Sequence, residues 1–258
     1  MRLLLVIVGL CFVWKSQAQS VPSMAKIDVQ LAINQSLPLA ERISFEILSS
    51  NSKKLKNQLE RWDNITAVTL KDGWLRVGWT EQPRFNGTVG PEHTRNSFVI
   101  DFEEASTLEF TQGFKKQKGN VFTPKELAGY TNVYIENPTY IHGFDIASVA
   151  ARKRSGDCTE YAVLTVALAR SLQLASRVIV GTVIVEGEAS VDAFGHAWTE
   201  VWHNGRWQII DAAMVDSIAK RLFYFPASEI DNEGPGYRMS LFNAVSLMPE
   251  RIRNLKSE

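Results

Sequence analysis

The chain has 258 residues, of which 45% are hydrophobic and 22% are charged, and its 28 basic residues balance 28 acidic ones. A chain of this length can bury one large core or two modest ones. The neutral balance argues against nucleic acid and against an anionic membrane surface as the main partner.

The N-terminal stretch MRLLLVIVGLCFVWKSQAQS has the pattern of a secretory signal peptide. Arg2 precedes an apolar run from Leu3 to Trp14, and Ser16-Gln17-Ala18 is a small-x-small cleavage pattern. The run is shorter than the about 20 residues that span a bilayer, and no later segment approaches that length. We therefore expect residues 1–18 to be removed and the mature chain to begin at Gln19, with no integral membrane segment and a secreted or periplasmic location.

Cleavage after Ala18 would leave Cys158 as the one cysteine of the mature chain, because it removes Cys11. Lipidation of Cys11 is the less favoured alternative, since Leu10 stands where lipoproteins have a small residue. Proteins of oxidising compartments usually pair their cysteines or lack them. The lone thiol is therefore a candidate for reactivity or for an intermolecular partner.

Residues 19–115 are expected to form a smaller region of mixed α/β character. In AVTLKDGWLRVGWT, alternating apolar residues flank the turn Lys71-Asp72-Gly73, which predicts a β-hairpin. Arg95–Phe102 is a further strand candidate. The charged, glycine-containing stretch Thr111–Asn120 is the best linker candidate, so we place a boundary between residues 115 and 116.

Residues 116–258 have a different character. Thr123 and Glu126 form a capping-box pattern with Pro124 at the first helical position, which predicts a helix to about Ile135. A helix from Thr159 to Leu174 is apolar on almost every face and is therefore expected to be buried. The remaining expected elements are a short helix over 145–153 and strands over 177–185, 196–202 and 207–212.

Cys158 precedes the buried helix, where unpaired backbone N–H groups and the positive end of the helix dipole meet. This position predicts a lowered thiol pKa and N–H donors for an oxyanion. The alternative is a buried cysteine that acts as a small hydrophobic residue.

His196 is the histidine that the sequence places beside a carboxylate. Asn204-Gly205 is a strong two-residue hairpin signal, so residue n should face residue 409 − n, and Trp198 then opposes Asp211. His196 lies diagonally next to Asp211, at about 7 Å between backbones. Glu200 is the other carboxylate on this face of the strand, but it lies roughly 13 Å from His196 along the strand. Asp211 is therefore the expected partner of His196.

The pattern favours a Cys158–His196–Asp211 triad, with His196 as base and Asp211 orienting its ring. A histidine that only completes the core is the alternative for His196. Metal chemistry is weaker, since no H-E-x-x-H or paired C-x-x-C pattern is present. No phosphate-binding loop is present either, and no cofactor is expected. The tryptophans on the His196 face are expected to be core residues or cleft walls: Trp198, Trp202 and Trp207.

The ordered blocks RSGDCTEYA, ALAR, FGHAWTEVW and GRW, followed by Asp211, resemble the transglutaminase-like superfamily of bacterial type. Thirty-eight residues separate Cys158 from His196 and 15 separate His196 from Asp211, which is similar to the family's spacing. The resemblance implies an α+β, papain-like transglutaminase core, in which a buried helix carrying the cysteine packs on an antiparallel sheet carrying histidine and aspartate. It also implies Cys158 as nucleophile, His196 as base and Asp211 as orienter. Animal members have a tryptophan before the nucleophile as an oxyanion donor, and this chain has none between Trp79 and Cys158.

The expected activity is a cysteine-dependent reaction on amide bonds of a protein or peptide, through an acyl-thioester. Water would resolve the thioester as in a peptidase or amidase, and an amine would resolve it as in a cross-linking acyltransferase. The missing upstream tryptophan favours hydrolysis, because nothing in the sequence roofs a water-excluding channel. A non-catalytic binding module on the same fold is the alternative class. The sequence shows no acidic loop for calcium and leaves the oligomeric state open.

Overall fold

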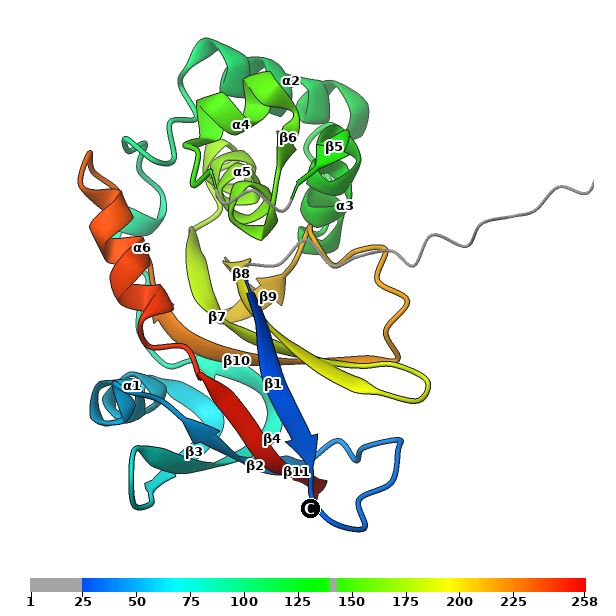
Figure 1. Cartoon of the computed structure of the whole chain (residues 1–258). Helices are drawn as coiled ribbons and strands as arrows, with labels where there is room; N and C mark the ends of the chain where they lie inside the picture. The colour runs from blue at the N-terminus through cyan, green and yellow to red at the C-terminus, as the bar shows by residue number, and fades with distance from the viewer. Residues whose placement is uncertain (1–24, 140–142) are drawn as a thin grey trace, which may run out of the picture.

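The computed structural model describes residues 25–139 and 143–258. The expected signal peptide and its cleavage site lie outside these residues, as does His142. The fold is α+β, as predicted: helices α2–α5 gather at one end, strands β7–β10 form the middle, and the remaining long strands with α1 form the other end (Figure 1). No helix within the described ranges is long and apolar enough to cross a bilayer.

The helices in chain order are α1 (Ser52–Leu59), α2 (Ala105–Lys118), α3 (Pro124–Tyr134), α4 (Ala147–Lys153), α5 (Cys158–Ser171) and α6 (Tyr237–Val245), with a 3₁₀ turn at Pro91–His93. The strands are β1 (Ala25–Leu31), β2 (Ile43–Leu48), β3 (Trp62–Thr69), β4 (Trp74–Phe85), β5 (Asn137–Pro138), β6 (Ser155–Gly156), β7 (Ser176–Glu186), β8 (Val191–His203), β9 (Arg206–Ile210), β10 (Arg221–Glu229) and β11 (Arg251–Ser257).

One curled sheet connects the two ends of the molecule. Its strand order is β10-β7-β8-β1-β11-β2-β4-β3, and β9 pairs with β8 beside this path. Strands β1 and β11 come from opposite ends of the described chain and run parallel, side by side, at the centre of this order (Figure 1). Strands from both predicted parts of the chain therefore share the sheet, and the division at 115/116 itself stays a prediction.

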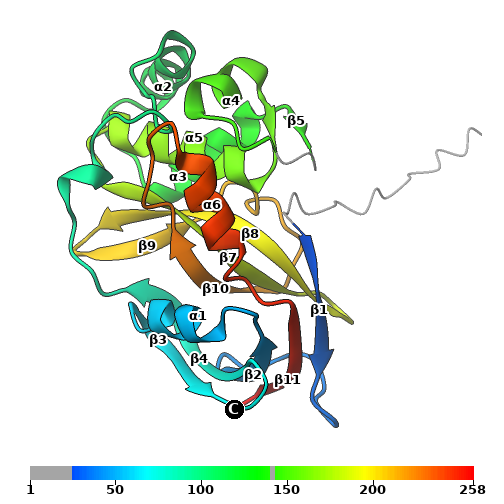
Figure 2. The same cartoon turned by 60° about the vertical axis from the view of Figure 1, so that its left-hand side comes forward.

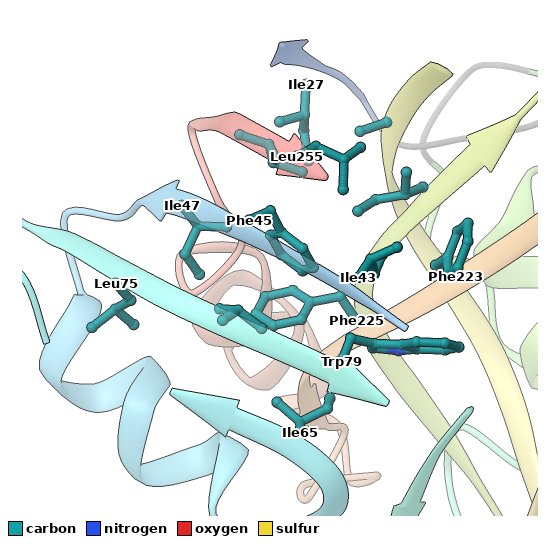
Figure 3. Close-up of a cluster of buried hydrophobic side chains, with 14 of the residues drawn as sticks. Ile27, Ile43, Phe45, Ile47, Ile65, Leu75, Trp79, Phe223, Phe225 and Leu255 are labelled. Atoms are coloured by element: carbon teal, nitrogen blue, oxygen red, sulfur yellow. The ribbon is translucent and has the colours of Figure 1, made fainter. Parts of the chain in front are cut away.

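A cluster of large apolar side chains joins β2 and β4 to β10 (Figure 3). Phe45 meets Phe225 edge-on at 5.6 Å between ring centroids, and Trp79 meets Phe223 at 5.0 Å. The Trp79 indole also donates to the Tyr224 carbonyl oxygen at 3.1 Å. Burying these rings removes much apolar surface from water, so the N-terminal strands are anchored directly to the strand that follows β9.

Helix α5 is buried along its length by α2, α3 and α4 on one side and by β7 and β8 on the other (Figure 2). Every residue from Cys158 to Arg170 is buried, which confirms the expected buried helix. The helix begins one residue earlier than predicted and ends at Ser171. Helices α3 and α4 are confirmed, and the Glu126 carboxylate of α3 accepts from the Thr123 N–H at 2.8 Å.

The β3–β4 hairpin is also confirmed. Its strands pair antiparallel up to Thr69 and Leu75. The turn between them places Asp72 and Gly73 at positive φ, 56° and 79°. Aspartate and glycine tolerate this region better than other residues do, which explains why the turn forms there.

Two other expectations are wrong. Thr111–Asn120, expected as a linker, is mostly the second half of α2, because Phe110, Thr111 and Phe114 provide a buried face against the other helices. Arg95–Phe102 is not a strand. Val99 and Ile100 are buried among the helices, and Val99 bonds through its backbone to Glu233 and Ala147 rather than to a neighbouring strand.

Candidate active site

Cys158 is the first residue of α5, and Asp157 caps that helix. Asp157 Oδ1 accepts from the Thr159 N–H at 2.9 Å, and Glu160 Oε2 accepts from the Asp157 N–H at 2.8 Å. This reciprocal capping box sets where the helix starts. The Cys158 N–H has no hydrogen-bond acceptor among the described residues, so it is free to donate to an oxyanion formed on a carbonyl that the thiol attacks.

The thiol of Cys158 is fully buried and accepts a hydrogen bond from the Ala197 N–H on β8. Burial, followed by the negative charge of Asp157, raises the pKa of the thiol well above its usual range, and Asp211 and Glu160 act in the same direction. The prediction of a lowered pKa is therefore wrong. Removal from water and three nearby carboxylates outweigh the helix dipole and the Ala197 N–H, because all of these act in a site without bulk solvent.

The β8–β9 hairpin brings His196 to Asp211, as its register predicted. Trp202 pairs with Trp207 and Thr199 with Ile210. Continuing that register places Asp211 just past the end of β9, opposite Trp198. His196 Nε2 lies 2.7 Å from Asp211 Oδ2.

The hydrogen bond to Asp211 assigns the tautomer of His196. A carboxylate only accepts, so Nε2 carries a proton. Nδ1 is buried and has no hydrogen-bond partner in the part of the chain that the structure describes. The backbone of Ala197, the residue after His196, forms a hydrogen bond that lowers the pKa of the Cys158 thiol, so Cys158 lies near the His196–Asp211 pair at the N-terminus of α5.

Tyr224 on β10 is a fourth member of this cluster that the sequence did not reveal. Its hydroxyl donates to Asp211 Oδ2 at 2.8 Å, and the Ala213 N–H donates to Oδ1 at 3.0 Å. Burial, followed by the charge of Asp211, raises the pKa of Tyr224 well above its usual range, so the phenol keeps its proton. Tyr224 lies on β10, which pairs with β7, whereas Asp211 follows β9. The two residues meet only through the packing of the sheet, so no local sequence motif predicts their contact.

The competing carboxylate, Glu200, is not at the site. It binds Arg177 on β7 through Oε2, with 3.0 Å to the Arg177 Nε. Trp198 is fully buried beside His196, with 6.3 Å between their ring centroids, and therefore belongs to the core. Trp207 lines a cavity. The Trp202 ring packs against the Trp207 ring, with 5.7 Å between their centroids.

A cavity of about 750 Å³ lies next to the Asp211 end of the cluster. Asp211 and Tyr224 form part of its wall, whereas Cys158 and His196 do not, and both of these are 0% exposed. Its charged lining residues are Glu81, Arg84, Lys125 and Arg206 from β4, the start of α3 and β9. Across the described ranges, no group of three His, Cys, Asp or Glu side chains is placed to hold a metal ion.

A cysteine at the start of a buried helix, beside a histidine–aspartate pair on a neighbouring hairpin, is the arrangement of the papain-like and transglutaminase-like class of proteins. The family comparison agrees: residues 109–212 match the model of the transglutaminase-like superfamily. This part of the chain is a transglutaminase-like domain.

Solved structures of similar proteins have low sequence identity to the chain. The periplasmic domain of TgpA from Pseudomonas aeruginosa, bound to ethylmercury, is 16% identical with a TM-score of 0.43, over 71% of this chain and 75% of that one. A Cytophaga hutchinsonii protein provisionally described as a cysteine protease is 12% identical with a TM-score of 0.34, over 81% of this chain and 89% of that one. None of the curated proteins matches the chain in sequence.

Proposed function

We propose that this protein is an exported thiol enzyme that cleaves amide bonds in proteins or peptides, with Cys158 as nucleophile, His196 as base and Asp211 as orienter. The observation that carries the proposal is the His196 ring, which is bonded to Asp211 through Nε2 while its buried Nδ1 has no hydrogen-bond partner among residues 25–139 and 143–258. Leaving a buried polar atom unpaired costs free energy. A proton acceptor kept free for the neighbouring thiol accounts for that cost.

The raised thiol pKa implies that attack and proton transfer occur together. As Cys158 Sγ bonds to the carbonyl carbon, its proton passes to His196 Nδ1, and the carbonyl oxygen becomes an oxyanion facing the Cys158 N–H. Collapse breaks the C–N bond, and His196 protonates the leaving amine, which leaves a thioester. Water then attacks the thioester, His196 accepts its proton, and the C–S bond breaks to give an acid and the restored thiol.

Hydrolysis is favoured over transfer to an amine. A cross-linking enzyme must keep water from its thioester. Here the cavity beside Asp211 carries four charged side chains, Trp198 is committed to the core, and no tryptophan lies between Trp79 and Cys158. These features do not supply an apolar acceptor channel among the described residues, which favours hydrolysis. The signal-peptide pattern supports a secreted or periplasmic location.

The test is intact-protein mass spectrometry after acid quench, with the mature protein mixed with glutamine-containing peptides and a biotinylated primary amine in excess. We expect an acyl adduct on Cys158 and mainly free-acid product. Cys158→Ala and His196→Ala should abolish the adduct, whereas His203→Ala, a matched histidine change at the hairpin turn, should leave it. Mainly biotinylated product would instead establish an acyltransferase.

The complete burial of Cys158 and His196 favours one second candidate, a binding module that keeps the fold without turnover. It predicts peptide binding without an adduct on Cys158. The same experiment separates the two, because binding alone leaves the mass of the protein unchanged.

A further inference from the structure

Tyr224 forms a hydrogen bond with Asp211 Oδ2, the same carboxylate oxygen that binds His196. Asp211 Oδ2 accepts from the Tyr224 hydroxyl at 2.8 Å and lies 2.7 Å from His196 Nε2. Two donors therefore share one carboxylate oxygen, while the other oxygen accepts from the Ala213 N–H.

Several elements fix the tyrosine ring. Tyr224 pairs with Val183 in the β10–β7 ladder, and its carbonyl oxygen accepts from the Trp79 indole of β4. Its ring meets the Trp198 ring edge-on, with 5.2 Å between centroids. Tyr224 as a whole is 5% exposed, so these contacts hold the ring on nearly all sides.

Packing alone does not account for the hydroxyl. A phenylalanine would keep the contact with Trp198 and the apolar cluster around it. The hydroxyl has one partner among the described residues, the Asp211 carboxylate. A hydrogen bond to a charged group in a buried site is about twice as strong as one between neutral groups.

We propose that Tyr224 is a positioning residue, which holds Asp211 Oδ2 in place and sets how strongly that oxygen accepts from His196. This inference rests on the proposed function for its catalytic consequence, but not for its effect on the His196–Asp211 bond. With the second donor removed, Oδ2 is freer to move and is a stronger acceptor for the Nε2 proton. The imidazolium is then retained more tightly, so the histidine returns its proton less readily to the leaving amine.

Tyr224→Phe tests this in the full mature chain. The direct measurement is the ¹H resonance of the His196 Nε2 proton in protein labelled with ¹⁵N-histidine, assigned by its loss in His196→Gln. We expect this resonance to move downfield in Tyr224→Phe and to stay in place in the matched control Tyr130→Phe, whose hydroxyl donates to the Phe110 carbonyl oxygen at 3.0 Å. With a substrate, kcat should fall about 10- to 100-fold with KM unchanged, and the acidic limb of the pH profile should move.

A second measurement covers a Tyr224→Phe variant that folds poorly. Replacing all tyrosines by 3-fluorotyrosine keeps the ring packing and makes the phenol a stronger donor, so the same resonance should move upfield. An unchanged resonance in folded Tyr224→Phe, or in the fluorotyrosine protein, overturns the inference. The NMR result does not need turnover. A shifted resonance in a protein that forms no acyl adduct therefore supports the role of Tyr224 while rejecting the proposed function.

Discussion

Two buried networks use polar residues on the same face of β8, and they differ in whether every group has a partner. Around Glu200, Arg177 binds both Glu200 and Glu229, and Glu229 also binds Arg61 at 2.6 Å. The Arg177 guanidinium lies 3.5 Å from the centroid of the Phe85 ring. Around His196, by contrast, Nδ1 has no hydrogen-bond partner within the described ranges.

Paired charges explain the electrostatics of the first network. Burial alone would raise the pKa of Glu229. Arg177 and Arg61 together lower it by more, so the pKa of Glu229 lies below its ordinary value. In the second network, burial and neighbouring carboxylates raise the pKa of Cys158, and they outweigh the Ala197 backbone hydrogen bond that lowers it. The comparison indicates that the Glu200 network holds the structure together, whereas the His196 network is the one to which we assign proton transfer in the proposed function.

The largest expected effect comes from Asp211→Asn. The side-chain amide would place the wrong tautomer on His196, so acyl-enzyme formation should slow by up to about 10⁴-fold, by analogy with serine triads. The thermal midpoint should stay within a few degrees of the wild type. Rapid-quench mass spectrometry measures the rate, and Asp63→Asn, which removes an exposed partner of Arg84, is the control. A rate within about tenfold of the wild type would exclude Asp211 from the mechanism.

Arg177→Met should be the most destabilising change in the paired network. It leaves the buried Glu200 carboxylate and the partly buried Glu229 carboxylate without their shared cation, which costs about 3–5 kcal/mol of unfolding free energy. Arg76→Met removes an exposed arginine from Glu46, which keeps Arg253 as a second partner, and should cost less than about 1 kcal/mol. Chemical denaturation measures both. Adding Glu200→Gln to Arg177→Met should recover part of the loss, and a loss below about 1 kcal/mol for Arg177→Met alone would contradict a structural role.

The next prediction concerns pH. Burial, followed by the charge of Asp157, raises the pKa of Glu160 to about 7, above the value of about 4.3 for a free glutamate. The folded state therefore holds this proton more tightly, and the stability it contributes is complete below about pH 4 and lost as pH rises to about 7. The loss is up to about 4 kcal/mol at 1.36 kcal/mol per pKa unit.

Unfolding free energies measured from pH 4 to pH 8 should therefore fall less steeply in Glu160→Gln than in the wild type. Glu126→Gln provides the opposite case: hydrogen bonds from Lys118 and Thr123 lower the pKa of Glu126 to about 2. Its contribution is present above about pH 4 and lost as pH falls towards 2. Equal slopes for wild type and Glu160→Gln would show that Glu160 is not the titrating group.

The smallest expected effect extends the comparison to an exposed network. Thr123 begins α3, where its backbone N–H and hydroxyl both donate to Glu126. Thr123→Ala removes the hydroxyl and should lower the unfolding free energy by about 0.5–1 kcal/mol. Ser52→Ala at the start of α1 is a comparison without a side-chain cap and should have less effect. A loss of unfolding free energy above about 2 kcal/mol for Thr123→Ala would contradict the small contribution expected of an exposed cap.

Local sequence patterns determined much of the fold and the contact between two of the three candidate triad residues, His196 and Asp211. The Asn204-Gly205 turn predicted the β8–β9 register, and that register alone placed His196 beside Asp211. The capping pattern of α3 and the uniform apolarity of α5 likewise predicted real elements. These features depend on neighbours along the chain or across one tight turn, so sequence contains the needed information.

Only the tertiary structure decided the remaining properties, because they depend on contacts between distant segments. The pKa of Cys158 follows from burial by helices on one side and β8 on the other, and this reversed the direction expected from the helix dipole. Tyr224 reaches Asp211 through the packing of β10, and Arg177 claims Glu200 from the neighbouring strand β7. In the same way, Phe110 and Phe114 find a buried face and turn a charged stretch, which looks like a linker in sequence, into a helix.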